Sequence, residues 1–373
     1  MQSSEQNTPR NDSPIKSSAP IVESGYIVEK NDPVLVTGAN GFIGSRVVEG
    51  LLELGFENVR CFARSSSGGN RLQAIAKIDG NASRMEIITG NLLSPQDCAN
   101  AAKDAKVIFH LAAGRGEKSF PDAFMNSVVT TRNLLEAAGH GCLKRFVNIS
   151  SFSVYSNRGK SRGKLLDETC PMEEHPALRG EAYCFAKVEQ DRIVMEYGRK
   201  RGIPYVIVRP GQVYGPGNEG ITGRVGIGTF GIFLHLGGSN TIPLTYVDNC
   251  ADAIIQIGLK HGTDGQIFNV VDDNLPTSRK FLRLYKKNVG AFPSLYVPHA
   301  VSYTLCYLWE KYSVWSQEQL PLAFNRRRWH SYWKSTSYSN EKLKTLVGWK
   351  PKVNTQDALS RFFASCRMQR ARA

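Results

Sequence analysis

A tyrosine and a lysine four residues apart, Tyr183 and Lys187, form the pair in this sequence best suited to moving a proton. Both lie in a stretch with a helical pattern, so their side chains fall on one helix face, one turn apart. A free phenol has a pKa near ~10 and is a poor base at neutral pH. An ammonium group one turn away stabilises the phenolate, so the pair predicts general acid–base chemistry.

Two serines favour this interpretation over the alternative, a solvated helix face that carries the same spacing by chance. Ser150 and Ser151 follow residues 146–149, a short apolar run that predicts a strand. The carboxyl ends of parallel strands are where this type of sheet places its chemistry. Ser151 can hydrogen-bond a substrate hydroxyl or carbonyl and align it with Tyr183.

A glycine-rich turn lies about 140 residues earlier in the chain. Gly38, Gly41 and Gly44 follow the apolar run 34–36 and open a helical pattern. In a dinucleotide-binding turn, the first glycine permits the tight turn and the second lets the backbone approach a pyrophosphate. The third lets the helix pack on the strand, and the free amides at the helix start hold the negative charge. The spacing predicts dinucleotide binding; the alternative is a merely structural turn.

The cofactor is predicted from the end of the second strand, about twenty residues after Gly44. An acidic residue there would bind the ribose 2′-hydroxyl of NAD. This chain instead has Ala63, Arg64 and two serines, Ser65 and Ser66. A guanidinium beside two hydroxyls suits a 2′-phosphate, which favours NADP(H) over NAD(H). The alternative is that Arg64 is an ordinary surface charge.

These candidate residues need a framework, and the middle of the chain alternates strand-like runs with helical patterns. The helical patterns are 45–54, 125–138 and 183–199, and the strand-like runs are 34–36, 59–63, 85–88, 107–111, 146–149 and 205–208. Such alternation predicts a doubly wound parallel α/β sheet of the Rossmann type. After about residue 210 the rhythm breaks. We therefore expect a Rossmann domain at 33–210 and a smaller mixed substrate lobe at 211–365, with some chain crossing back.

Composition predicts an ordinary globular protein, with 41% hydrophobic and 21% charged residues in a 373-residue chain. Residues 1–32 are polar and predict a disordered leader rather than a signal peptide. No apolar stretch reaches ~18 residues, so no membrane-spanning helix is expected. The eight cysteines are scattered without a Cys-x-x-Cys pair. That pattern argues against a metal site and predicts a reducing, cytoplasmic location.

Positive charge is concentrated near the C-terminus. The whole chain has a net charge of +14, and residues 324–373 hold twelve Lys or Arg against two acids. The last eight residues, 366–373, are expected to form a basic tail. The basic stretch 324–373 is either a solvated face or a surface that attracts anionic lipid or a phosphate-bearing substrate. Nucleic acid is not expected, since no binding motif accompanies the charge.

The motifs together resemble the extended short-chain dehydrogenase/reductases, in the NAD(P)-dependent epimerase/dehydratase family. The resemblance covers roughly residues 33–365 and rests on an ordered series of motifs: 37–44, Gly90-Asn91-Leu92, His110-Leu111-Ala112-Ala113, Asn126, Ser150-Ser151, Tyr183 with Lys187, 209–217, 246–249 and 346–351. One departure is Asn91, where the family usually has Asp. An amide would then face the adenine amino group, which weakens recognition of the base.

The resemblance also implies roles for individual residues. Tyr183 would be the catalytic acid/base, Lys187 would lower its pKa and bind the nicotinamide ribose, and Ser151 would hold the substrate oxygen. The residues implied in cofactor binding are Gly38, Asn40, Gly41, Phe42, Ile43, Gly44, Arg64, Asn91, Leu92, Leu111, Ala112, Ala113, Asn126, Tyr183, Lys187, Pro210 and Val213.

The branch of the family, and with it the substrate, is left open by the sequence. Nucleotide-sugar members usually carry an arginine before the Tyr-Val-Asp motif, but residues 242–245 contain no cation. The aromatic stretch 296–315 and the basic run 326–328 resemble the 3β-hydroxysteroid dehydrogenase-like branch, in which a hydrophobic helix can meet a membrane. Packing of that helix on the substrate lobe is the alternative, and a homodimer is compatible with the resemblance.

Three functions therefore compete. The leading one is an NADP(H)-dependent oxidoreductase that acts on a lipophilic secondary alcohol or ketone. The second is a nucleotide-sugar epimerase or dehydratase, which keeps its cofactor bound and returns the hydride to the same molecule. The third is a non-catalytic NADP(H)-sensing protein. The Ser151, Tyr183 and Lys187 set argues against the third, because a binding module does not need a tuned phenol.

Overall fold

The computed structural model describes residues 25–64, 70–78, 80–114, 119–139, 142–159, 161–317 and 324–372. The first 24 residues of the predicted leader thus lie outside the described residues. For residues 25–32 the prediction of disorder is wrong. Val28 is buried in the core with Tyr26 and Ile27 packed beside it, and the Ile27 amide donates to the Leu259 carbonyl oxygen at 2.8 Å. This apolar triplet is enough to anchor the segment.

Seven parallel strands form one sheet in the order β12-β7-β5-β4-β1-β2-β3. Their bounds are β1 Val34–Thr37, β2 Val59–Ala63, β3 Met85–Thr89, β4 Val107–His110, β5 Arg145–Ile149, β7 Tyr205–Pro210 and β12 Ile267–Val270. In β1, Val34 and Val36 pack into the core on one face and Leu35 into the core on the other. Side chains alternate along a strand, so an unbroken apolar run buries both faces. The predicted doubly wound sheet is confirmed.

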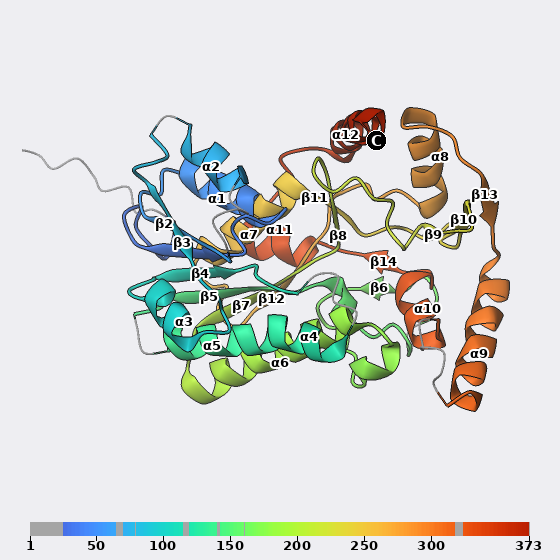
Figure 1. Cartoon of the computed structure of the whole chain (residues 1–373), viewed down its shortest axis with the longest axis horizontal. Helices are drawn as coiled ribbons and strands as arrows, with labels where there is room; N and C mark the ends of the chain where they lie inside the picture. The colour runs from blue at the N-terminus through green and yellow to red at the C-terminus, as the bar shows by residue number, and fades with distance from the viewer. Residues whose placement is uncertain are drawn as a thin grey trace, which may run out of the picture.

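Helices cover both faces of this sheet (Figure 1). One face carries α1 (Gly44–Glu53), α7 (Val247–Leu259) and α11 (Glu341–Val347), and the other carries α3 (Pro95–Ala102), α5 (Thr130–Ala138) and α6 (Ala182–Arg201). The shorter α2 (Asn70–Ala76) follows β2. The strand order reverses between β1 and β4, and such switch points are where open α/β sheets bind their ligands.

The helix predicted over 125–138 has a more complex form. A short helix, α4 (Phe120–Phe124), runs through a π-helical turn, η1 (Met125–Val129), into α5. Hydrogen-bonded turns of this wider type occur mostly as single insertions within α-helices, often at functional sites. The sequence pattern did not predict it, because a single wider turn is too short to change the apolar period of the helix around it.

The C-terminal half adds a smaller mixed lobe built on three small sheets. They pair β8 (Gln212–Tyr214) with β11 (Leu244–Tyr246), β6 (Leu165–Leu166) with β14 (Ser337–Tyr338), and β10 (Ile232–His235) with both β9 (Gly226–Thr229) and β13 (Ser294–Tyr296). The helices of the lobe are α8 (Ser278–Asn288), α9 (His299–Trp315), α10 (Arg326–Tyr332) and α12 (Thr355–Arg372), and two short 3-10 turns, η2 (Phe152–Val154) and η3 (Pro176–Arg179), lie between β5 and α6. The lobe is not one continuous piece, since α7, β12 and α11 pack in the Rossmann layer.

The basic tail predicted at 366–373 is instead the last part of α12. Cys366 is buried and packs with Phe362 in the core of the substrate lobe, so the helix continues through the predicted boundary. The helix periodicity of 355–372 places these apolar residues on one face.

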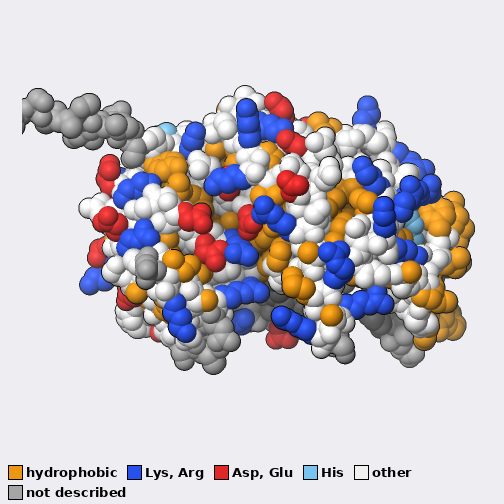
Figure 2. Space-filling view, turned by 90° about the horizontal axis from the view of Figure 1, so that it is seen from above, with side chains coloured by type: hydrophobic (Ala, Val, Ile, Leu, Met, Phe, Trp, Pro, Cys, Tyr) orange, Lys and Arg blue, Asp and Glu red, His pale blue; other side chains and the backbone are white. Residues whose placement is uncertain are grey.

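The basic run 326–328 lies in α10, and all three of its arginines form ion pairs. Arg326 pairs with Glu310 at 2.9 Å, Arg327 with Glu173 at 2.7 Å and Arg328 with Glu181 at 3.3 Å. These contacts tie α10 to α9 and to the segment that precedes α6. Elsewhere, Lys and Arg side chains are spread across the face shown in Figure 2, with hydrophobic side chains gathered at its right-hand end. No helix within the described ranges is long and apolar enough to cross a bilayer.

Candidate active site

The glycine turn has a geometry that side chains would block at all three predicted positions. Gly38 has φ +66°, and a Cβ there would lie 2.8 Å from the Ala112 amide nitrogen. Cβ atoms on Gly41 and Gly44 would lie 2.9 and 2.1 Å from the Gly38 carbonyl oxygen. Since such distances are far below ordinary contact, the turn requires glycine in each place. The backbone at the start of α1 is therefore open to a ligand.

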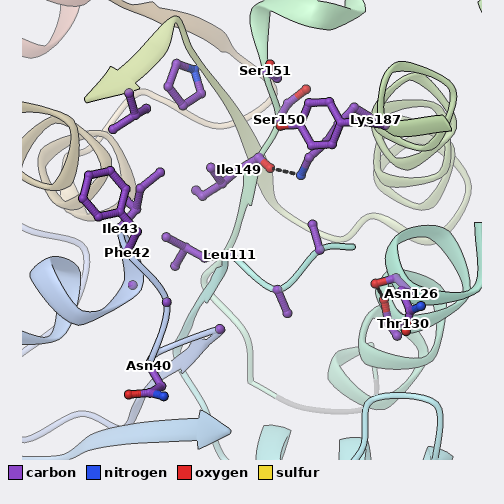
Figure 3. Close-up of a pocket in the computed structure, with 18 of the residues that line it drawn as sticks. Asn40, Phe42, Ile43, Leu111, Asn126, Thr130, Ile149, Ser150, Ser151 and Lys187 are labelled. Atoms are coloured by element: carbon purple, nitrogen blue, oxygen red, sulfur yellow. Dashed lines mark hydrogen bonds between the residues drawn. The ribbon is translucent and has the colours of Figure 1, made fainter. Parts of the chain in front are cut away.

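The turn forms one end of a cavity of about 770 Å³ at the switch point of the sheet. Every residue that the sequence predicted for cofactor binding or catalysis lines this cavity: Gly38, Asn40, Gly41, Phe42, Ile43, Gly44, Arg64, Asn91, Leu92, Leu111, Ala112, Ala113, Asn126, Ser151, Tyr183, Lys187, Pro210 and Val213. In Figure 3 Asn40 lies at one end, Ser150, Ser151 and Lys187 at the other, and Leu111 between them. Segments from β1 to β8 thus contribute to one site.

Lys187 is held firmly at the far end of the cavity from the turn. Its Nζ donates to the Ile149 carbonyl oxygen at 2.6 Å, the contact drawn in Figure 3, and to Gln190 Oε1 at 2.8 Å. Only 4% of the residue is exposed. A buried ammonium needs such partners, because desolvation without hydrogen bonds is costly.

Tyr183 lies one turn earlier on α6, in its first turn, and is 40% exposed. Its side chain lines the same cavity as Lys187. The phenol can therefore be approached by a substrate from outside while the lysine behind it stays buried.

The two serines at the end of β5 have different surroundings. Ser150 Oγ donates to the buried Asp191 carboxylate at 2.8 Å, which commits its hydroxyl to the protein core. Ser151 Oγ accepts from the Ser153 amide at 3.1 Å as the N-cap of η2, and its own proton remains a donor. Both line the cavity, but the geometry favours Ser151 as the serine that contacts a substrate oxygen.

Charge in the cavity is sparse and positive. Among the described residues that line it, Arg64 and Lys187 are the cations, and none is acidic. Arg64 directly follows β2 and is exposed. Ser65 and Ser66, the two hydroxyls predicted beside it, lie outside the described residues.

The structure fits a dinucleotide at this position. Asn40 Oδ1, in the glycine turn, is buried and has no hydrogen-bond partner among the described residues, so it is available to a ligand. Asn91, which replaces the usual aspartate, is bound by its own loop. Its Oδ1 accepts from the Leu93 backbone amide at 3.0 Å, and its own backbone amide donates to Asp97 Oδ2 at 2.7 Å.

Several lining residues were given no role by the sequence analysis: Phe62, Ala63, Thr130, Ile149, Ser150, Gly211, Gln212 and Asn218. Most of them neighbour a predicted residue in sequence. Thr130 lies four residues after Asn126, one turn along the same helix, and that spacing could have identified it. Asn218 carries no such signal. A turn brings it to the cavity, and in that turn its side-chain amide donates to the Val213 carbonyl oxygen.

A doubly wound sheet with a glycine turn at its switch point defines the class of Rossmann-type dinucleotide-binding proteins. Within that class the chain belongs to the NAD dependent epimerase/dehydratase family, whose model matches residues 34–270. This match includes the glycine turn and the segments that carry Ser151, Tyr183 and Lys187.

Individual relatives span reductases, dehydrogenases and epimerases. Cinnamoyl-CoA reductase 1 of Oryza sativa subsp. japonica is 32% identical over 49% of this chain and 54% of that protein. The chain spans about half the length, 54% to 58%, of three such curated relatives. The 3-beta-hydroxysteroid dehydrogenase of Mycolicibacterium neoaurum is 27% identical over 88% of this chain and 89% of that protein.

Among solved structures, the UDP-glucuronic acid 4-epimerase of Bacillus cereus, in complex with UDP-glucuronic acid and NAD, has a similar fold. The TM-score is 0.68 with 22% identity, over 90% of this chain and 99% of that one. This similarity confirms the fold over 90% of the chain.

Proposed function

We propose that this enzyme is an NADP(H)-dependent oxidoreductase that interconverts a secondary alcohol and a ketone. The observation that carries the proposal is the single cavity with the glycine turn at one end and Ser151, Tyr183 and Lys187 at the other. When bound, the nicotinamide supplies or accepts the hydride. The chain's own residues then have to bind the nucleotide, orient the substrate oxygen and move one proton.

Each residue of the site fits one of these tasks. The Ser151 hydroxyl donates to the substrate oxygen and orients it towards Tyr183. The Tyr183 phenol gives its proton to that oxygen in reduction and removes it in oxidation. The buried Lys187 ammonium stabilises the phenolate, because opposite charges attract strongly where water is excluded.

The preference for NADP(H) rests on Arg64. No described residue that lines the cavity offers a carboxylate to a ribose 2′-hydroxyl, whereas Arg64 offers a guanidinium to a 2′-phosphate. A guanidinium binds phosphate through paired hydrogen bonds, which adds orientation to affinity.

Arg64→Ala is expected to weaken NADPH binding by ~1.5–3 kcal/mol, the scale of hydrogen bonds to charged groups, and to leave NADH binding almost unchanged. Titration of nucleotide binding by intrinsic fluorescence measures both affinities. Arg60→Ala is the matched control, since Arg60 lies on the same strand but does not line the cavity. Equal losses for NADPH and NADH would show that Arg64 does not select the cofactor.

The substrate is proposed to be lipophilic rather than a nucleotide sugar. A diphosphate needs cations at the substrate end, and the described residues that line the cavity offer none there beyond Lys187. Two basic residues that could have served lie elsewhere. Arg224 donates to the Ser331 carbonyl oxygen and stacks over Tyr332, and Lys260, at the C-terminal end of α7, does not line the cavity. One relative, aligned over 88% of this chain and 89% of its own, is a 3-beta-hydroxysteroid dehydrogenase.

The competing function is a nucleotide-sugar epimerase, favoured by the likeness to a Bacillus subtilis protein named as an uncharacterized UDP-glucose epimerase, 32% identical over 191 residues. A thermal-shift panel with NADP⁺ present separates the two. Steroid ketones and other lipophilic ketones should raise the melting temperature, and UDP-sugars should not, because only a ligand that binds the folded state stabilises it. Stabilisation by UDP-sugars alone would favour the epimerase.

We also propose a contact between α9 and anionic lipid. Val301, Leu305, Leu308, Tyr312 and Trp315 are exposed and recur at helical spacing on one face of α9. α9 and β13 lie at the right-hand end of the molecule in Figure 1, the end where hydrophobic side chains gather in Figure 2. Beside them in Figure 1, α8 carries five cations and no acid: Arg279, Lys280, Arg283, Lys286 and Lys287.

Binding to vesicles that contain anionic lipid is expected at low salt and should fade as salt rises, because screening removes the attraction of α8. Co-sedimentation measures it. Leu308→Gln should weaken binding, and Leu346→Gln, an exposed leucine on α11, should not. If the wild-type protein fails to sediment with anionic vesicles at low salt, the face is simply solvated.

A further inference from the structure

A chain of buried hydrogen bonds joins the Lys187 ammonium to the start of the glycine turn. Gln190 Oε1 accepts from Lys187 Nζ at 2.8 Å, and Gln190 Nε2 donates to Thr131 Oγ1 at 2.9 Å. Thr131 Oγ1 lies 2.8 Å from His110 Nε2, and His110 Nδ1 lies 2.8 Å from Thr37 Oγ1. The four residues beyond the lysine are fully buried. This series of hydrogen bonds runs from α6 through α5 and β4 to the last residue of β1.

The hydroxyl of Thr131 fixes the direction of these bonds. Its one proton goes to the Ser127 carbonyl oxygen at 2.5 Å, and Gln190 donates to the oxygen. His110 Nε2 must then donate as well, so His110 is neutral with its proton on Nε2, and its Nδ1 accepts from Thr37. Burial, with the charge of Lys187 adding to it, lowers the pKa of His110 to about 3, so the imidazole stays neutral across the working range.

We propose that His110, Thr131 and Gln190 are positioning residues, which act through Gln190 to hold the Lys187 ammonium beside Tyr183. This inference rests on the proposed function, because it gives the hydrogen-bond chain a role in that same site. Thr131 is the central residue of this series of hydrogen bonds. Without its oxygen, two buried N–H donors lose their acceptor, and the Gln190 amide is no longer oriented with Oε1 towards Lys187.

The nearby charged groups are already paired with one another. Asp191, next to Gln190 on α6, accepts from the Arg209 guanidinium at 2.9 Å and from Asn148 at 2.9 Å, as well as from Ser150. Its carboxylate is therefore committed, and the Lys187 ammonium donates to two neutral acceptors, the Ile149 carbonyl oxygen and Gln190 Oε1.

The test follows the ionisation of Tyr183 directly and needs no substrate. Protein labelled with [¹³Cζ]tyrosine is titrated by NMR with saturating NADP⁺, and the Tyr183 resonance is assigned by its loss in Tyr183→Phe. Thr131→Val keeps the side-chain shape and removes the oxygen. We expect it to move the Tyr183 titration upward by at least about one pH unit, a tenfold change in the dissociation constant. Thr131→Ser, which restores a hydroxyl, should titrate like the wild type.

Thr263→Val is the matched control for a lost buried hydroxyl. Thr263 is 1% exposed, its Oγ1 donates to the Ile257 carbonyl oxygen at 2.9 Å, and it does not line the cavity. This variant should leave the Tyr183 titration unmoved. If Thr131→Val does not fold, Gln190→Met removes the next link and is expected to give the same upward shift.

The outcomes separate this inference from the proposed function. A wild-type Tyr183 that titrates near ~10, like a free phenol, would overturn the electrostatic role of Lys187, and the positioning role with it. A low wild-type midpoint that Thr131→Val and Gln190→Met leave unchanged would overturn the positioning role alone. An equal shift in Thr263→Val would also overturn it, since the effect would then be one of general stability.

Discussion

Tyr183→Phe is expected to lower turnover by the ~10²–10⁴-fold that is typical of a lost general acid or base. The substitution removes one oxygen and keeps the volume of the ring. Because Tyr183 is partly exposed and its ring remains, the fold should survive. In the proposed function the glycine turn and Arg64 hold most of the nucleotide, so its affinity should change little. Steady-state kinetics and a parallel binding titration measure the two effects separately.

Tyr197→Phe is the matched control for this experiment. Tyr197 lies on the same helix, outside the cavity, and its hydroxyl donates to Glu136 on the protein surface. The control should retain wild-type turnover. If Tyr183→Phe also retains it, another group moves the proton and the assignment of Tyr183 is wrong.

Lys187→Met is expected to have the second large effect and to act in two ways. The buried ammonium is lost, so the phenolate of Tyr183 is less stable and the midpoint of the pH–rate profile should rise towards ~10, the value for a free phenol. At neutral pH turnover should fall by ~10²-fold or more, the lower end of the range for lost acid–base catalysis. Cofactor binding should weaken as well, since the lysine lines the same cavity as the glycine turn.

Lys200→Met controls for the loss of a lysine from α6, because Lys200 is exposed and paired with Glu196 at the far end of the helix. It should change neither the profile nor the affinity. The informative result is the pair of pH–rate profiles for the wild type and Lys187→Met. If activity is lost while the midpoint stays in place, Lys187 only positions other groups and the electrostatic account of Tyr183 is wrong.

Much of the fold could be predicted because its signal is local. Each parallel strand is a short apolar run, since both faces of the sheet are covered. The turn between β1 and α1 requires glycine, because a Cβ at any of its three glycines would lie less than 3 Å from a backbone atom. The candidate site was predictable for a related reason. In a doubly wound sheet the carboxyl ends of the strands meet, so residues that follow strands, such as Arg64 and Ser151, converge on one cavity.

The features that sequence reasoning missed depend on contacts between distant parts of the chain. His110 reaches Thr37 across 73 residues and Thr131 across 21, so no local pattern shows that a single hydrogen-bond chain connects them. The basic run 326–328 reads as a surface charge until the fold brings acids from α9 and from residues 173–181 against it. Residues 25–32 read as polar leader because only a triplet, with Val28 at its end, reaches the core.

The most direct test of the account is the stoichiometry of nucleotide consumption. Purified protein is first assayed for bound nucleotide. It is then supplied with NADPH and the ketone that stabilises it most, and NADPH oxidised is compared with alcohol formed. The account predicts little retained nucleotide, one NADPH oxidised for each alcohol produced, and no epimerisation of UDP-sugars. Tightly bound NAD in the purified protein, with a UDP-sugar epimerised in the absence of added nucleotide and no net loss of NADPH, would contradict it.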